Sequence, residues 1–234
     1  AGGIRLIESD DDNDIWAIYR SETNLNFYRA TDGASFSQIG YLSPASAAGL
    51  IDFTGQHRSS LAVGALEDYA DKVGMIVVAS GQYSPLSDSD AVNINESLPT
   101  VQLASTRGDK RVFGVISDSE EASNPERHYS AGCFTSAYEK REGDHRLIIN
   151  SLGEGAIWVS DINDNLENGD YITSCEISGY GMKQDDDLLH NYTVAKITQD
   201  CNFDLSSSGY ECKEIEFSGS THKVAFVGCT YHCG

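Results

Sequence analysis

The sequence lacks two features that would assign it to a large class of proteins. Long hydrophobic runs are missing: no apolar stretch approaches the ~18 residues that span a bilayer, so we expect no membrane span. Basic side chains are few, with 16 Lys and Arg against 36 Asp and Glu, and the formal net charge is −20. Because every phosphate contact would start from net repulsion, this balance argues against a nucleic-acid-binding protein.

The familiar catalytic motifs are also missing. There is no P-loop, no GxGxxG after a strand, no GxSxG and no HExxH. We therefore expect no metabolic enzyme and no cofactor. The chain begins at Ala1 without a signal-like segment, which indicates a processed product or a fragment.

Cysteine is missing from the first 132 residues, and the six cysteines are Cys133, Cys175, Cys201, Cys212, Cys229 and Cys233. An even number suits disulfides in an oxidising compartment, although sequence cannot choose among the pairings. Cys201 and Cys212 flank the polar segment Asn202–Glu211 and are the simplest pair to close a loop. Free buried thiols are an equally serious alternative, because cysteine is among the most buried residue types.

What is present is β-strand signal. The first short β-branched or aromatic runs are Ile15–Arg20, Leu25–Ala30 and Phe36–Leu42, at the roughly ten-residue spacing of a meander. Denser apolar runs follow downstream. Only Ser59–Val73 could form a helix, and Gly64 weakens it. The sequence thus predicts a mainly β protein with at most one short helix.

The density of apolar residues changes near residues 43–60. Upstream, the strands carry too few large apolar side chains to form a core, as in a β shaft whose missing surface comes from neighbouring chains. Downstream, the apolar runs suffice for an autonomous domain. We therefore predict a thin, trimeric β shaft-like segment over residues 1–50 and a compact β-rich C-terminal cap over residues 51–234.

Several sequence elements follow one another in a characteristic order. They are DFTGQHR (52–58), LEDYA (66–70), DKVG (71–74), VFGVIS (112–117), GDYIT (169–173) and GYGMK (179–183). Over roughly residues 50–203 the chain resembles the C-terminal intramolecular-chaperone domain of the phage neck-appendage autoproteolytic family. It resembles more closely the related C-terminal domains in fibre-like proteins of large algal and amoebal viruses.

The resemblance implies a domain at the C-terminus of a trimeric fibre that sets the register of the three chains. In some members the domain then cuts itself off at its N-terminal edge. The acidic residues Glu67, Asp68 and Asp71 match the family's acidic element and are the catalytic candidates. A carboxyl group with a raised pKa could activate water or protonate the leaving amide.

Other residues near this edge offer a second route to the same chemistry. Asp52, His57, Ser59 and Ser60 could supply a nucleophile and a base. The structural alternative is that the carboxylates solvate the outer face of a short helix and that His57 is a core or turn residue.

The acidic composition also raises the question of cations. Asp10–Asp14, Asp161–Asn165 and Asp185–Asp187 could bind calcium but lack the EF-hand pattern, and turns explain them equally well. Cys229, His232 and Cys233 have an unusual spacing for zinc, which favours disulfides instead. Asn95 and Asn191 lie in glycosylation sequons, and Asn95, in a polar loop, is the better acceptor.

Three functions are compatible with these observations. The first is a structural, chaperone-like registration cap of a homotrimeric fibre, at a virion surface or outside the cell. The second is a secreted β-sandwich module that binds a host-surface glycan or receptor, with Tyr171, Tyr180, Tyr192 and Trp158 as an aromatic platform. The third is an autoprotease that releases itself at its N-terminal edge.

Overall fold

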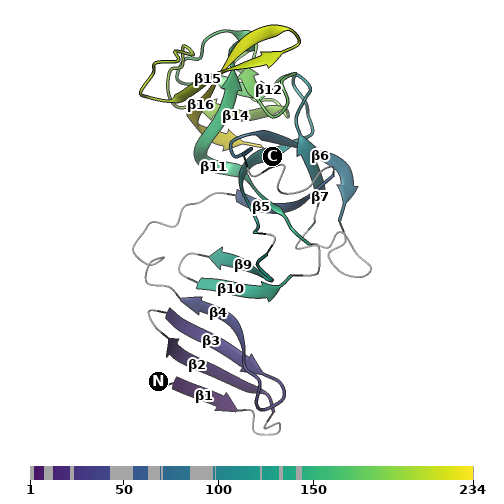
Figure 1. The fold of residues 1–234 in the computed structure, drawn as a ribbon, viewed down its shortest axis with the longest axis vertical. Helices are drawn as coiled ribbons and strands as arrows, with labels where there is room; N and C mark the ends of the chain where they lie inside the picture. Colours follow the sequence, from purple (N-terminus) through teal and green to yellow (C-terminus); the bar gives the residue numbers. More distant parts are fainter. Residues whose placement is uncertain are drawn as a thin grey trace. The chain divides into compact units, whose positions relative to one another are not determined.

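The structure is a computed structural model. It describes residues 3–7, 13–21, 24–42, 55–62, 69, 71–84, 97, 99–121, 123–131, 134–140 and 144–233. Within these ranges the named elements are β-strands and the 3-10 turn η2 (Asp161–Asn163), which confirms a mainly β protein with at most one short helix (Figure 1). No helix in this part of the chain is long and apolar enough to cross a membrane.

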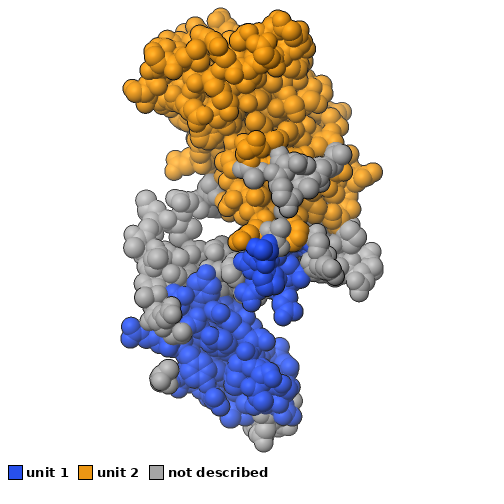
Figure 2. Space-filling view, in the orientation of Figure 1, with its two compact units in different colours: residues 1–52, 122–144 blue, residues 53–121, 145–234 orange. Residues whose placement is uncertain are grey.

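The chain divides into two compact units, each made from two separate stretches (Figure 2). Unit 1 comprises residues 1–52 and 122–144, and unit 2 comprises residues 53–121 and 145–234. The sequence predicted a domain boundary after residue 50. This lies close to residues 52 and 53, where the chain first passes from unit 1 to unit 2. The same prediction assigned residues 122–144 to the second part, whereas the structure places them in unit 1.

Unit 1 is one six-stranded antiparallel sheet in the order β1-β2-β3-β4-β10-β9. Its first four strands form a meander, as the spacing of the early runs predicts. The last two form a hairpin that enters from later in the chain and pairs β10 with β4. The strands are β1 (Gly3–Ile7), β2 (Ile15–Ser21), β3 (Asn24–Ala30), β4 (Ser37–Leu42), β9 (Glu126–Ala131) and β10 (Phe134–Glu139).

Unit 2 is a ten-stranded sheet that closes on itself twice. The pairings β11-β5-β7-β6-β8-β11 form one ring, and β11-β16-β14-β12-β13-β11 form another, so the two rings share β11. Strand β15 adds to the outer edge of β16. The strands are β5 (Gly55–Leu61), β6 (Ile76–Tyr83), β7 (Pro99–Leu103), β8 (Val112–Ser119), β11 (Leu147–Ser160), β12 (Tyr171–Ser174), β13 (Gly181–Lys183), β14 (Thr193–Ile197), β15 (Glu211–Phe217) and β16 (Ser220–His232).

The long strand β11 connects the two rings. Its first half pairs with β5 and β8, and its second half pairs with β16. A bulge lies where the partners change, because Asn150 pairs with Gln56 and Leu152 pairs with Gly55, which leaves Ser151 as the extra residue. Bulges of this kind redirect a side chain out of the regular ladder.

The segment considered for a helix, Ser59–Val73, begins instead in a strand. Ser59 is fully buried in β5, and the neighbouring Ser60 pairs with Thr100 of the parallel strand β7. Pairing in the closed ring outweighs the weak local helix propensity of this segment. Residues 63–68 and 70 lie outside the described residues.

The apolar core lies in unit 2. All three clusters of buried hydrophobic side chains found among the described residues belong to this unit. Its largest fully buried side chains come from both rings and their connections; they include Phe203, Ile76, Ile116, Leu147, Ile149, Ile157, Leu166 and Ile172. Unit 2 therefore has an apolar core within one chain, although it also exposes several large apolar side chains: Val73, Tyr83, Leu152, Leu188, Leu189 and Leu205.

Candidate functional site

The feature of unit 1 that requires explanation is an apolar sheet face. Side chains alternate along a strand, and residues paired across antiparallel strands share a face. The register pairs Leu6 with Trp16 and Leu25 with Leu42. We call the resulting surface the open face; its members are Ile4, Leu6, Trp16, Ile18, Leu25, Phe27 and Leu42.

Much of the open face is exposed in the single chain. The exposed fractions are 61% for Ile4, 59% for Leu6, 45% for Trp16 and 39% for Leu25. Single exposed apolar residues are ordinary, but contiguous ones on a soluble protein mark an interaction surface.

The charged strand residues on this face of β1–β4 are Arg20 and Arg29. Arg29 lies over the Trp16 ring, 5.7 Å from its centroid, and donates two hydrogen bonds to Asp14 at 3.0 and 2.6 Å. In a chain of net charge −20, this surface therefore carries cations rather than carboxylates in its strands.

The opposite face of the same sheet is covered by its own side chains. Ala17 and Ala30 are each 1% exposed. Tyr19 lies edge-on to Tyr28, and Arg5 lies over the Tyr19 ring. Aromatic and polar groups thus shield the small residues on this side. On the open face Arg29 covers part of Trp16, while Ile4 and Leu6 remain more than half exposed.

The structure gives no support for a catalytic group made of Glu67, Asp68 and Asp71, because it describes only Asp71. Glu67 and Asp68 lie outside the described residues. Asp71 is exposed, and Lys72 Nζ lies 2.9 Å from its carboxylate. The hydrogen bond from Lys72 lowers the pKa of Asp71, which is opposite to the raised value that a general acid needs.

His57 contacts a serine that the sequence did not indicate. Its Nε2 lies 2.9 Å from Oγ of Ser151, the bulge residue of β11, 94 positions later. The Ser151 hydroxyl lies 3.1 Å from the Gly55 carbonyl oxygen and donates to it. The sequence paired His57 with Ser59 or Ser60, and the structure places Ser151 against it.

The environment of His57 favours its neutral form. The ring packs against Phe113, with ring centroids 5.2 Å apart. Partial burial against this ring lowers the pKa of His57 below its usual 6.5, although the residue as a whole remains exposed, so the imidazole is largely neutral at neutral pH. A hydroxyl, a neutral imidazole and a peptide carbonyl therefore meet at one point.

Five of the six cysteines are described, and all five are free thiols; Cys133 lies outside the described residues. Cys175, Cys201, Cys229 and Cys233 are buried, and Cys212 is half-buried. Burial raises the pKa of Cys229 and of Cys233 to about 12, which keeps both protonated.

The C-terminal Cys-His-Cys group does not converge on one point. In β16, Cys229 and Tyr231 are buried on one face, and His232 lies on the other, where its ring meets Tyr171. The alternation of side chains along a strand explains this separation. Among the described residues no group of three His, Cys, Asp or Glu side chains is arranged to hold a metal ion.

The acidic runs considered for calcium have protein partners where they are described. Asp14 binds Arg29, Asp185 binds Arg107 at 2.9 Å, and Asp161 accepts from the Lys223 amide at 3.1 Å. Residues 10–12 lie outside the described residues. So does the glycosylation candidate Asn95, while Asn191 is exposed in a turn before β14.

The predicted aromatic platform does not form. Trp158 and Tyr180 are both buried in one core cluster and meet edge-on at 6.2 Å. Tyr192 stacks on His190, and Tyr171 contacts His232. Trp158 and Tyr180, two of the four residues of the predicted platform, are therefore core residues, which is usual for aromatic side chains in strands.

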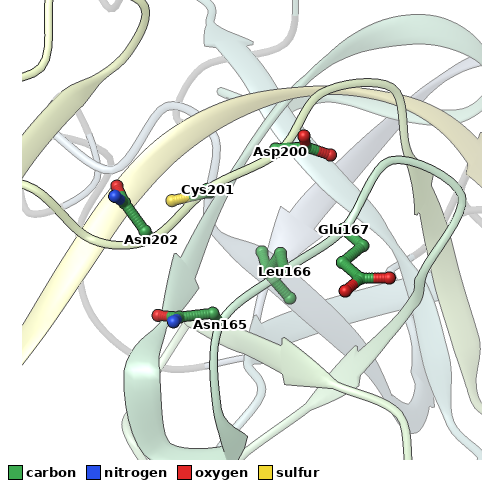
Figure 3. A pocket seen from close by; sticks show the side chains of 6 residues that line it. All are labelled: Asn165, Leu166, Glu167, Asp200, Cys201 and Asn202. Carbon is green, nitrogen blue, oxygen red and sulfur yellow. The ribbon is translucent and has the colours of Figure 1, made fainter.

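Unit 2 has a surface hollow of about 310 Å³ where the 164–170 turn meets the segment after β14. Leu166 and Cys201 exchange backbone hydrogen bonds there at 2.8 and 2.9 Å. Figure 3 shows Asn165 and Asn202 on one side and Glu167 and Asp200 on the other. Amide and carboxylate groups of this kind can hydrogen-bond a small polar ligand.

Three comparisons with known proteins were negative: no family model, no curated protein and no solved structure matches this chain.

Proposed function

We propose that this chain is the C-terminal region of a homotrimeric fibre, at a virion surface or outside the cell. In the proposed assembly, copies of unit 1 pack through the open face, and unit 2 is the cap that sets register. The observation that carries the proposal is the exposed apolar face of a sheet whose unit contributes no buried hydrophobic cluster among its described residues.

The two units differ in what they need from a partner. Unit 2 has its own clusters of buried side chains and needs no partner to complete them. Unit 1 has one sheet layer, and a sheet with one apolar face must bury that face against another layer. Three copies turned inward about an axis supply that layer for one another.

The free energy available from the open face is moderate. Fully burying a large aliphatic or aromatic side chain stabilises by ~1.5–3 kcal/mol, so covering what Ile4, Leu6, Trp16 and Leu25 now expose gives on the order of 3–6 kcal/mol per copy. Because separate chains must associate, the fraction of trimer should rise with protein concentration.

Charge is compatible with packing at this face. Arg20 and Arg29 lie there, and charged residues, acidic ones above all, are depleted from interface cores. Three chains carry a total formal charge near −60, three times −20, so close contact is least opposed where carboxylates are few and paired, as Asp14 is with Arg29.

Two adjacent residues provide a matched test. Leu6 and Ile7 are neighbours in β1, are 59% and 56% exposed, and point to opposite faces. Native mass spectrometry of Leu6→Lys should show loss of the trimer, because the ammonium group would be buried at the interface. Ile7→Lys should keep the trimer. Equal behaviour of the two variants would overturn the assignment of the interface to the open face.

We propose self-cleavage at Gly55 as a second candidate function, because Ser151, His57 and the Gly55 carbonyl meet at the β11 bulge. The Ser151 hydroxyl, which donates to the Gly55 carbonyl in the structure, would first have to turn its proton toward His57 Nε2. Ser151 Oγ would then attack the Gly55 carbonyl carbon and pass its proton to the Nε2 of the neutral, Nδ1-protonated imidazole. His57 would then protonate the Gln56 nitrogen as the Gly55–Gln56 bond breaks, and water would hydrolyse the ester left on Ser151. The carboxylates Glu67, Asp68 and Asp71 take no part in this scheme.

The topology limits what such a cut could achieve. After cleavage, β4 would still pair with β10, which belongs to the later part of the chain. The N-terminal fragment would therefore stay bound to the rest, unlike the release that the resemblance implies.

The cut is tested by incubating the intact chain and analysing it under denaturing conditions by mass spectrometry. A fragment beginning at Gln56 should accumulate in the wild type and disappear in Ser151→Ala. Ser117→Ala is the matched control, because Ser117 also donates to a backbone carbonyl, at 3.1 Å, in the same sheet. A wild-type chain that stays intact, or a fragment that persists in Ser151→Ala, would reject the scheme.

A further inference from the structure

The segment after β14 carries Cys201 across strand β16. Strands β14 and β15 lie on opposite sides of β16, so the chain must cross β16 after Ile197. It crosses at Gly228: the Thr198 amide donates to the Gly228 carbonyl at 3.0 Å, and a Cβ at Gly228 would lie 3.0 Å from Thr198 Oγ1. A glycine on β16 thus allows the close approach.

Beyond the crossing, the segment lies beside the start of β15. Gln199 Nε2 donates to the Gly209 carbonyl at 3.5 Å, and the Tyr210 hydroxyl donates to Asn202 Oδ1 at 2.5 Å. The Asp204 amide donates to the same hydroxyl at 3.1 Å. These contacts close the loop formed by residues 202–211.

A thiol lies at each end of this closed loop. Cys201 is buried in the largest hydrophobic cluster, and Cys212 packs against the same cluster and is half-buried. Cys212 lies in β15 and Tyr210 directly precedes this strand, and both side chains pack against that cluster.

We propose that Cys201 and Cys212 form a disulfide when the protein meets a small-molecule disulfide such as oxidised glutathione. The bond would close the 202–211 loop covalently and brace the wall of the hollow that Cys201 and Asn202 line. The geometric support is that both thiols pack against one hydrophobic cluster, at the two ends of a loop that the Tyr210–Asn202 hydrogen bond closes.

The remaining described thiols do not offer an equivalent pair. Cys229 and Cys233 are four residues apart in an extended segment, which separates their Cα atoms by ~13 Å at ~3.3 Å per residue. A disulfide needs Cα atoms within ~7 Å. Cys175 belongs to another cluster, where its thiol donates to the Tyr180 carbonyl at 3.3 Å.

The exposure of the two cysteines sets the order of the reaction. The Cys212 thiolate attacks a sulfur of oxidised glutathione, forms a mixed disulfide and expels one glutathione thiolate. The Cys201 thiolate then attacks the Cys212 sulfur and expels the second glutathione. The two protons lost by the cysteines are taken up by the two glutathione molecules, so the protein is oxidised by two electrons and glutathione is reduced by two.

The sequence allows the bond to be located by peptide mapping. The folded wild type is treated with oxidised glutathione, its remaining thiols are alkylated, and the chain is digested with trypsin. Cys201 and Cys212 share the tryptic peptide 197–213, which contains no other cysteine. Cys175 lies on peptide 147–183, and Cys229 and Cys233 lie on peptide 224–234, which serve as internal controls.

The expected result is peptide 197–213 lighter by two hydrogen atoms and resistant to alkylation, while both control peptides are alkylated. Cleavage after Glu211 should then leave its two parts joined until reduction. Three results would overturn the proposal. Peptide 197–213 could be alkylated at both cysteines, could still carry glutathione at the end of the reaction, or could be joined to a control peptide.

A variant at the more exposed position separates the pair from a single reactive thiol. In Cys212→Ser, Cys201 should resist glutathione, because it is 1% exposed. Rapid modification of Cys201 in this variant would contradict the proposed order of attack. In the wild type the reaction should be faster at pH 9 than at neutral pH, since burial raises the pKa of both thiols.

Discussion

Unit 2 has buried hydrophobic clusters of its own, whereas the described part of unit 1 has none and leaves a contiguous set of apolar side chains on one sheet face. Unit 2 also exposes large apolar side chains, among them Leu188 and Leu189 at 64% and 62%, but these two lie outside its strands and do not share a sheet face. The difference arises from closure. In unit 2 the strands pair into two rings around β11, so their inward-facing side chains meet one another. In unit 1 the sheet is a single open layer, so one face has nothing to meet among the described residues.

The comparison teaches that neither apolar content nor strand content decides whether a β unit is self-sufficient. Ile4 and Leu6 are as apolar as Ile157 and Val159, yet the first two are more than half exposed and the last two are fully buried. A chain in which one unit is complete and the other is not has a built-in reason to assemble through the incomplete one.

The largest expected effect is the loss of a side chain from the core of unit 2. Ile157→Ala should lower the free energy of unfolding of unit 2 by ~2–5 kcal/mol, because Ile157 is fully buried and its removal leaves a cavity. Ile4→Ala makes the same chemical change on the open face. It should change the stability of the monomer by less than ~0.5 kcal/mol.

The two tryptophans let each unit be followed separately. Trp16 belongs to unit 1 and Trp158 to unit 2, and the chain has no others. Urea unfolding monitored by fluorescence in a Trp16→Phe background therefore reports on unit 2, and a Trp158→Phe background reports on unit 1. Equal losses for Ile157→Ala and Ile4→Ala would show that unit 1 has a closed core of its own.

The two units should also differ, by a smaller amount, in how their free energies of unfolding depend on pH. The pKa of His57 in unit 2 is lowered by burial, so the unfolded chain takes up the proton first as pH falls through 6.5. Unit 2 should therefore lose stability below pH 6.5, until the folded-state pKa is also passed. His57→Gln should flatten this part of the curve.

The stability of unit 1 should instead fall at a more acidic pH than that of unit 2. The hydrogen bond from Arg29 lowers the pKa of Asp14 below 3.8, so its contribution is present above pH 3.8 and is lost as pH falls through the folded-state value. The two fluorescence backgrounds measure both curves. A unit 1 curve that falls between pH 6.5 and 5, in step with that of unit 2, would contradict this separation.

The sequence carried enough information for the β class and for the deficiency of unit 1. The scarcity of large apolar residues predicted that residues 1–50 lack a core of their own. The described part of unit 1 contributes no buried hydrophobic cluster, but its strands do carry large apolar residues, and the open layer rather than their number leaves them exposed. Trimerisation, self-cleavage and the location of the protein remain predictions.

Other features left no readable signal along the chain. The polar sequence of residues 118–129, which contains Pro125, by itself favours a surface loop. Glu126–Ala131 nevertheless form β9, because an edge strand needs little more than free backbone groups to pair with. The contact between His57 and Ser151 joins residues 94 positions apart, and the register of β5 against β11 sets it. No local spacing could have indicated it.

Strand β11 shows how glycine can mislead. By their composition, Arg146–Ile149 and Ala156–Ser160 favour two short strands, separated by a segment that contains Gly153 and Gly155. The structure has one strand of 14 residues, and Gly155 in its middle leaves room for the Tyr231 ring. A glycine within a strand can mark close approach of another group rather than a bend.

The central claim is that other copies of the chain cover the open face of unit 1. Sedimentation velocity of the unmodified chain across the micromolar range tests it most directly. We expect a concentration-dependent species three times the 25.4 kDa of the single chain. A species of 25.4 kDa at every concentration would contradict the account.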